Sequence, residues 1–132
     1  MTVNDSAGII VRLNNLALLG RRSKLCETLH GYWSMPCGMC EDFEDPMRTA
    51  TREFFEETNI TLKSEIHFLT KFQNLKGGTF HVFYTDIKEL LYPDSRAIDA
   101  IEHDEWGFFK IEKNCLPNPI TKDTKNAILM LK

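Results

Sequence analysis

The sequence lacks three features that would assign it to other classes of protein. No apolar run approaches the roughly 20 residues that a membrane-spanning helix needs. The polar N-terminal segment Met1–Ser6 does not resemble a secretory signal peptide, so we expect a cytoplasmic protein. A formal net charge of −3 over 132 residues leaves no positive excess to hold nucleic acid. Repeats, low-complexity stretches and linkers are also missing, which predicts one domain over residues 1–132.

Cysteine is present, but its pattern does not indicate a disulfide framework. Four cysteines occur, at Cys26, Cys37, Cys40 and Cys115, and no export signal accompanies them. Cys37 and Cys40 have the C-x-x-C spacing of a redox or zinc motif. Acidic residues follow this pair, however, and no second close pair of ligands completes a zinc site. We therefore expect reduced cysteines, with a structural zinc or redox protein as an alternative function.

Negative charge is concentrated in one short segment. Residues 41–57 carry a formal charge of −5, which leaves +2 for the rest of the chain. Asp45 suits a helix N-cap, Pro46 suits the first helical position, and Asn59 suits the left-handed residue after a helix end. The segment therefore predicts a helix. Its apolar face is expected to consist of Met47, Ala50, Phe54 and Phe55.

Three glutamates share a patch beside that face. Glu53, Glu56 and Glu57 stand at i, i+3 and i+4, so their carboxylates project from one side of the helix. Such a patch is either a solvated surface or a binding site for a hard divalent cation, which takes oxygen ligands. The patch lies near the C-terminal end of the helix, where the helix dipole disfavours negative charge. A bound cation would remove this unfavourable interaction.

The spacing around these glutamates resembles the Nudix box of the MutT-like hydrolases, G-x5-E-x7-R-E-U-x-E-E-x-G-U, in which U is a bulky apolar residue. Eight of the nine specified positions between residues 38 and 60 match, and Asn59 replaces the last glycine. The preceding stretch Gly31–Gly38 is similar to the family's G-x-W-x-x-P-G-G, with Cys37 in place of one glycine.

The resemblance implies a hydrolase that uses Mg²⁺, or Mn²⁺ as a substitute, to cleave the pyrophosphate bond of a nucleoside diphosphate linked to another group. It implies four metal ligands, Glu53, Glu56, Glu57 and the backbone carbonyl of Gly38. Arg52 would orient these acids by pairing with Glu44 or a neighbour. The residue that accepts the proton from water is expected to be Glu53, Glu102 or Glu105.

Three residues outside the box are candidates for contact with the substrate. Arg21 and Arg22 are similar to the arginine pair of MutT-like members and could hold phosphates, or they could form a solvated rim at a strand end. Asn118 could contact a nucleobase, as an asparagine does in MutT-like relatives, or it could be the N-cap of a last helix ahead of Pro119.

The expected substrate is a nucleoside triphosphate, including oxidised forms. The proline typical of ADP-ribose-cleaving relatives and the tyrosine of dinucleoside-polyphosphate relatives are both missing near Leu75 and Lys76, and the coenzyme A signature is absent. Hydrolysis of ADP-ribose or nucleotide sugars is one alternative. A non-catalytic sensor of nucleotide derivatives on the same fold is another, although the intact acids favour an enzyme. The expected partner is a small molecule, with no membrane contact, and the protein is expected to be a monomer or a homodimer.

The rest of the chain predicts strands on both sides of the acidic helix, and hence an α+β protein. The predicted strands are Ala7–Leu13, Leu16–Arg21, Ile66–Phe72, Thr79–Ile87 and Trp106–Ile111. Asn14–Asn15 and Gly77–Gly78 are predicted to supply turns. A last helix is predicted to open at residues 117–119 and to carry an apolar stripe of Ile120, Thr124, Ala127, Ile128 and Leu131. The resemblance implies an α/β/α sandwich around a central mixed sheet.

Overall fold

The computed structural model describes residues 4–132, so Met1–Val3 of the polar N-terminal segment lie outside the described residues. The strands form one mixed sheet, in which β1 pairs in parallel with β6 and antiparallel with β2. The sheet order is β3 (Trp33–Ser34), β2 (Leu16–Arg22), β1 (Ser6–Leu13), β6 (Thr79–Ile87) and β5 (Ile66–Gln73). In addition, β4 (Cys37–Met39) pairs with β1, and β7 (His103–Lys110) pairs with β2.

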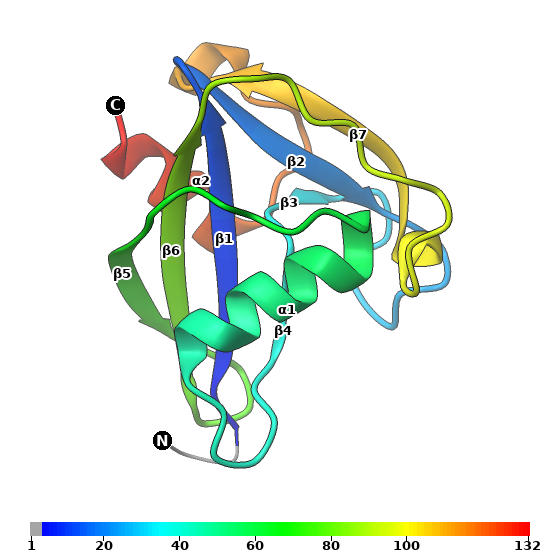
Figure 1. Cartoon of the computed structure of the whole chain (residues 1–132), viewed down its shortest axis with the longest axis vertical. Helices are drawn as coiled ribbons and strands as arrows, with labels where there is room; N and C mark the ends of the chain where they lie inside the picture. Colours follow the sequence, from blue (N-terminus) through cyan, green and yellow to red (C-terminus); the bar gives the residue numbers. More distant parts are fainter. Residues whose placement is uncertain (1–3) are drawn as a thin grey trace.

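One helix covers each face of the sheet (Figure 1). Because side chains alternate along a strand, Ile9 packs in a buried cluster with Phe54 of α1 (Pro46–Thr58), and Ile10 packs in a second cluster with residues of α2 (Lys122–Met130). The predicted α/β/α arrangement is therefore confirmed. Among residues 4–132, no helix is both long enough and apolar enough to cross a membrane.

The ends of α1 are those that the sequence predicts. The side chain of Asp45 accepts a hydrogen bond of 2.8 Å from the backbone N–H of Met47, which satisfies one free donor of the first turn. Asn59 follows the helix in the left-handed conformation, with φ 64°, and its N–H donates to the carbonyl of Phe55.

The inner face of α1 differs from the prediction. Ala50 and Phe54 are fully buried, but Met47 and Phe55 are 39% and 43% exposed. Glu57 takes the inner position instead and is 2% exposed. It lies three residues beyond Phe54, on the same side of the helix, so the helix directs a carboxylate toward the sheet.

The start of α2 also differs from the prediction. Asn118 is not the N-cap, because the helix begins at Lys122 and Thr121 is its N-cap. The preceding segment is bound to β3 instead: the N–H of Trp33 donates to the carbonyl of Pro119 at 2.9 Å, and the N–H of Thr121 donates to the carbonyl of Trp33 at 3.0 Å. These hydrogen bonds keep residues 119–121 extended, so the helix starts later.

A loop between β6 and β7 is attached to the C-terminal end of α1. The N–H of Asp99 donates to the carbonyl of Glu56 at 2.7 Å, and the N–H of Asp94 donates to the carbonyl of Thr58 at 2.9 Å. The loop ends in a single 3₁₀ turn, η1 (Ala100–Glu102), directly before β7, and a second such turn, η2 (Lys113–Cys115), follows β7. The last carbonyls of the helix therefore have partners, and the loop has a defined position beside the glutamates.

A bulge at the start of β7 decides which way its residues face. Arg21 is opposite Glu105 and Arg22 is opposite His103, so Asp104 has no partner position on β2. A bulge of this kind turns neighbouring side chains to faces that strict alternation would not give them.

Candidate metal and catalytic site

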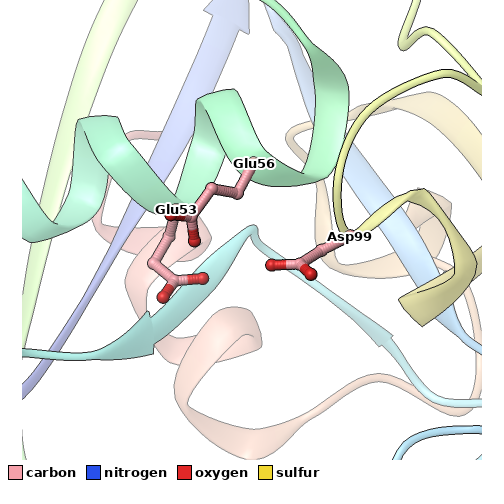
Figure 2. A group of neighbouring side chains, drawn as sticks. All are labelled: Glu53, Glu56 and Asp99. Atoms are coloured by element: carbon pink, nitrogen blue, oxygen red, sulfur yellow. The ribbon is translucent and has the colours of Figure 1, made fainter.

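Three carboxylates from two parts of the chain meet at one point. Glu53 and Glu56 extend from α1, and Asp99 extends toward them from the loop before η1 (Figure 2). One oxygen of each lies within 4.8 Å of the others, close enough for one metal ion to bind all three. Sequence reasoning missed Asp99. The signal that could have indicated Asp99 is the acidic stretch before β7, which also contains the candidate Glu102.

Glu57 lies beside this group, inside the protein. It is 2% exposed, its Oε1 lies 3.4 Å from Nδ1 of His103, and its Oε2 has no hydrogen-bond partner within the described chain. Glu57 is not one of the three acids that converge within 4.8 Å. Its unpartnered Oε2 is an oxygen of the kind that divalent cations bind.

Arg52 connects the acids to the loop before α1, as the sequence predicts. Its Nε and Nη2 donate to the two carboxylate oxygens of Glu44 at 2.8 and 2.9 Å. Its Nη1 donates to Glu53 at 3.1 Å and to Glu56 at 3.0 Å, and its Nη2 also donates to the carbonyl of Met39. One guanidinium therefore fixes three carboxylates relative to one another.

Glu44 is buried and held from several sides. Besides Arg52, it accepts hydrogen bonds from Oγ1 of Thr49 at 2.6 Å and from the backbone N–H of Glu41 at 3.1 Å. These donors, the guanidinium first, lower the pKa of Glu44 to about 2. Glu44 is thus charged at neutral pH and anchors Arg52, and it is not one of the three converging acids.

Electrostatic repulsion is strong among the remaining acids. Burial, reinforced by the neighbouring carboxylate of Glu56, raises the pKa of Glu53 to about 7. Burial and the charges of Glu53 and Glu102 raise the pKa of Glu57 well above its ordinary value. Burial and the charge of Asp99 also raise the pKa of Glu102. Carboxyl groups so close together favour protonation or a bound cation.

The backbone at Gly38 lies directly against this group. A Cβ atom at position 38 would lie 2.1 Å from the carboxyl carbon of Glu53, so any side chain there would displace that carboxylate. Gly38 is held at this point by β4, in which it pairs with Ala7 of β1.

The other predicted residues lie outside the converging acids. Arg21 donates to Asp104 at 2.7 Å and lies 3.4 Å from Glu105, so Glu105 is paired with an arginine. Arg22 donates from Nε to the carbonyl of Thr28 at 3.0 Å, and its positive charge opposes the rise in the pKa of Glu102.

Asn118 is exposed, in the segment that precedes α2. The structure therefore does not bring Asn118, Arg21 or Glu105 into the group formed by Glu53, Glu56 and Asp99.

The cysteines do not form a metal or redox centre. All four are free, and burial raises the pKa of Cys37 to about 12, which keeps it as a thiol. Within residues 4–132, the side chains close enough to hold a metal ion are carboxylates only. A thiolate reaction or a cysteine-bound zinc ion therefore has no support in this site.

A cavity of about 310 Å³ adjoins the inner acid. It is lined by Glu57, by His103 and Trp106 of β7, and by residues of the loop around Asp94 and Ile101. The space beside the acids is thus bordered by the same loop that carries Asp99.

Comparisons with known proteins agree with this architecture. The crystal structure of a MutT NUDIX hydrolase from Burkholderia pseudomallei superimposes with a TM-score of 0.80 over 100% of both chains, at 22% identity. The NUDIX domain of Shewanella oneidensis NrtR, complexed with ADP ribose, gives a TM-score of 0.74 at 13% identity and covers 99% of this chain and 87% of that one.

A curated relative extends the comparison to sequence. The CMP-5'-(N-acetyl-N-hydroxy-3-aminopropyl)phosphonate hydrolase of Streptomyces rubellomurinus is 32% identical over 88 residues, which cover 64% of this chain. The match spans 42% of that relative, so less than half of its length is represented. The NUDIX domain family model, in turn, matches residues 3–131, which include the whole box and both halves of the site. The predicted resemblance is therefore confirmed, and the chain belongs to the Nudix family.

Proposed function

We propose that this protein is a divalent-cation-dependent hydrolase that cleaves a phosphoric anhydride bond in a nucleotide. The observation that carries the proposal is the convergence of Glu53, Glu56 and Asp99, whose carboxylate oxygens lie within 4.8 Å of one another. The buried Oε2 of Glu57 supports it, because an unpartnered carboxylate oxygen is costly unless a cation binds it. Membership of the Nudix family supports an anhydride as the bond that is cleaved.

The donor set fits Mg²⁺, with Mn²⁺ as a substitute. These hard cations take carboxylate and carbonyl oxygens, which are the donors that this part of the chain offers. We assign as ligands the carboxylates of Glu53, Glu56, Glu57 and Asp99 and the backbone carbonyl of Gly38. When bound, the cation neutralises phosphate oxygens and acidifies the attacking water.

The chain's own residues orient the acids and accept the proton. Arg52 holds the carboxylates of Glu53 and Glu56 through hydrogen bonds of 3.1 and 3.0 Å. Glu53 and Glu102 are the candidate proton acceptors. The two carboxylates are neighbours, because the charge of Glu102 contributes to the raised pKa of Glu53. Glu105 ranks after them because Arg21 already pairs with it.

For the substrate, we propose nucleoside triphosphates first, including oxidised forms, with Arg22 as the phosphate-binding residue. The charge of Arg22 is felt by Glu102, and its Nε is bound to the carbonyl of Thr28 rather than to a carboxylate, whereas Arg21 is paired with Asp104. A nucleoside monophosphate joined to a small phosphonate or to a sugar phosphate is the second candidate. The name of the Streptomyces relative, a hydrolase of a CMP-linked phosphonate, favours this second class.

The test is turnover by the metal-free protein after addition of Mg²⁺ or Mn²⁺. The panel holds canonical and 8-oxo nucleoside triphosphates, a CMP-linked phosphonate, ADP-ribose and a nucleotide sugar, and released phosphate and pyrophosphate are measured. Glu56→Gln should lose about a hundredfold in rate, because it removes a ligand charge. Glu65→Gln, at an exposed position before β5, is the matched control and should keep its rate.

Two results would decide against the proposal. Turnover that does not need the cation, or that survives in Glu56→Gln, would remove the acids from the chemistry. A nucleotide that raises the melting temperature without being hydrolysed would favour a nucleotide sensor on the same fold.

A further inference from the structure

Two buried polar atoms face each other at the inner side of the acid group. Nδ1 of His103 and Oε1 of Glu57 lie 3.4 Å apart, and their side chains are only 4% and 2% exposed. Within the described residues, neither Nδ1 of His103 nor the second oxygen of Glu57, Oε2, has a hydrogen-bond partner. Because unpaired buried polar atoms are unfavourable, this arrangement calls for an explanation.

The ring of His103 is fixed by its surroundings. A Cβ atom at Gly20 would lie 2.6 Å from Cδ2 of His103, so the absence of a side chain at position 20 makes room for the imidazole. The indole of Trp106 also packs against the ring, with 4.6 Å between centroids. The bulge of β7 sets the register in which His103 faces Arg22 of β2. Packing therefore restricts the plane of the ring, and Nδ1 lies on the side toward Glu57.

In this arrangement the two carboxylate oxygens of Glu57 would have different partners. With a proton on Nδ1, a small approach of the two side chains would turn the 3.4 Å contact into a hydrogen bond from Nδ1–H to Oε1, and Oε2 would stay free for a cation. A carboxylate held by one oxygen cannot rotate away from the metal site. Donors that hold a ligand in this way typically account for 10–100-fold in metal affinity, as an order of magnitude.

We propose that His103 is a positioning residue for the metal site: it holds Glu57 so that one oxygen faces the cation. This inference rests on the proposed function, because it requires a divalent cation at the acids. It adds a residue outside the Nudix box, at the start of β7, to those on which metal binding depends.

The test measures the affinity of the metal-free protein for Mn²⁺ from the electron paramagnetic resonance signal of the free ion. His103→Leu removes the donor, and about tenfold weaker binding is expected. His103→Asn places an amide N–H where Nδ1 stands, and its affinity should return to within about threefold of wild type. His67→Leu is the matched control and should not change the affinity, because His67 lies in β5, at the opposite edge of the sheet, where its ring packs against Tyr84 of β6.

A purely structural role of His103 predicts a different result. In that case both variants would lower the melting temperature and leave Mn²⁺ affinity unchanged in the folded fraction. With a positioning role, the lost turnover of His103→Leu should return at saturating Mn²⁺, so that the Mn²⁺ requirement changes and kcat does not. If His103→Leu does not fold, His103→Gln replaces it, since its amide extends past the position of Nδ1 and should bind Mn²⁺ more weakly than His103→Asn.

The outcomes separate this inference from the proposed function. If the wild-type protein binds Mn²⁺ and His103→Leu, or His103→Gln in its place, binds it equally tightly, only the role of His103 is overturned. Wild-type protein that binds no Mn²⁺ would overturn the metal site itself, and the role of His103 with it.

Discussion

Arg52 binds Glu44 through two parallel hydrogen bonds, with Nε 2.8 Å from Oε2 and Nη2 2.9 Å from Oε1. The same guanidinium reaches Glu53 and Glu56 through Nη1. The guanidinium of Arg52 therefore joins the buried Glu44, in the loop before α1, to two of the acids that converge with Asp99. Both the stability of this region and the geometry of the site depend on it.

Replacement of Arg52 by methionine is expected to destabilise the fold by about 2–3 kcal/mol, because the nearly buried carboxylate of Glu44 would lose its charge partner. Arg52→Lys should recover only part of this loss, since an ammonium cannot make both parallel hydrogen bonds. Urea unfolding measures the difference, with the exposed Arg48→Met as control. Equal stabilities of Arg52→Met and Arg48→Met would contradict this prediction.

Glu44 should make the protein sensitive to acid. Its pKa is about 2 in the folded protein, below the ordinary 4.5, because Arg52 stabilises the charged form. The stabilisation is complete above pH 4.5 and is lost as the pH falls toward 2. The free energy of unfolding, measured by denaturant titration across this range, should decline less steeply in Glu44→Gln than in wild type. Parallel curves would show that Glu44 does not contribute.

Glu53 should have the opposite effect in the metal-free protein. Burial raises its pKa from 4.5 to about 7, so the folded state holds this proton more tightly than the unfolded state. Stability from this group is therefore full below pH 4.5 and declines as the pH rises through 7. We expect a loss on the order of 2–3 kcal/mol by pH 8, which is smaller in Glu53→Gln. Mn²⁺ should restore stability at pH 8. A melting temperature that changes neither with pH nor with added Mn²⁺ would contradict this prediction.

Gly38→Ala should separate metal binding from folding. The added methyl would lie 2.1 Å from the carboxyl carbon of Glu53, and Glu53 can move only by leaving its position in the acid group. We expect Mn²⁺ affinity to fall by about tenfold or more, with a stability change within about 1 kcal/mol. Calorimetric titration with Mn²⁺ checks this, and Met39→Ala, one residue away, should bind normally. Unchanged affinity in Gly38→Ala would place Glu53 outside the metal site.

Asp99→Asn tests the residue that sequence reasoning missed. The backbone N–H of Asp99, which donates to Glu56 at 2.7 Å, is kept in this variant, so the loop should remain docked. The loss of one ligand charge should weaken Mn²⁺ binding by about tenfold and slow turnover in parallel. Asp42→Asn removes the same charge at an exposed position in the loop before α1 and serves as control. Identical Mn²⁺ titrations for the two variants would remove Asp99 from the ligand set.

Local signals in the sequence were sufficient for the ends of α1 and for the hairpins. Asp45 and Asn59 cap the helix through interactions within a few residues, so the pattern contains what the structure uses. The pairing of Leu13 with Leu16 across the Asn14–Asn15 turn is equally local. The same holds for the pair of Arg52 and Glu44, whose spacing the box specifies.

The sequence was not sufficient where distant segments meet. Asp99 lies 43 positions after Glu56, and it joins the acids only because its loop is bound to the end of α1. Of the two roles considered for Asn118, contact with a nucleobase or the N-cap of α2, the second is wrong, because hydrogen bonds to Trp33 keep the segment extended. The pairing of Glu105 with Arg21 depends on register at the bulge of β7, which one strand's pattern does not encode.

The attachment of the loop to α1 has a consequence for how such a protein can diverge. Both hydrogen bonds, from Asp94 to Thr58 and from Asp99 to Glu56, use backbone groups of the loop and of the helix. An exposed side chain between them that is not part of this attachment, such as the 80% exposed Ile98, can therefore be exchanged without moving Asp99. Loop length is constrained while such exposed positions are free to change, so new substrate preferences can evolve next to an unchanged set of acids.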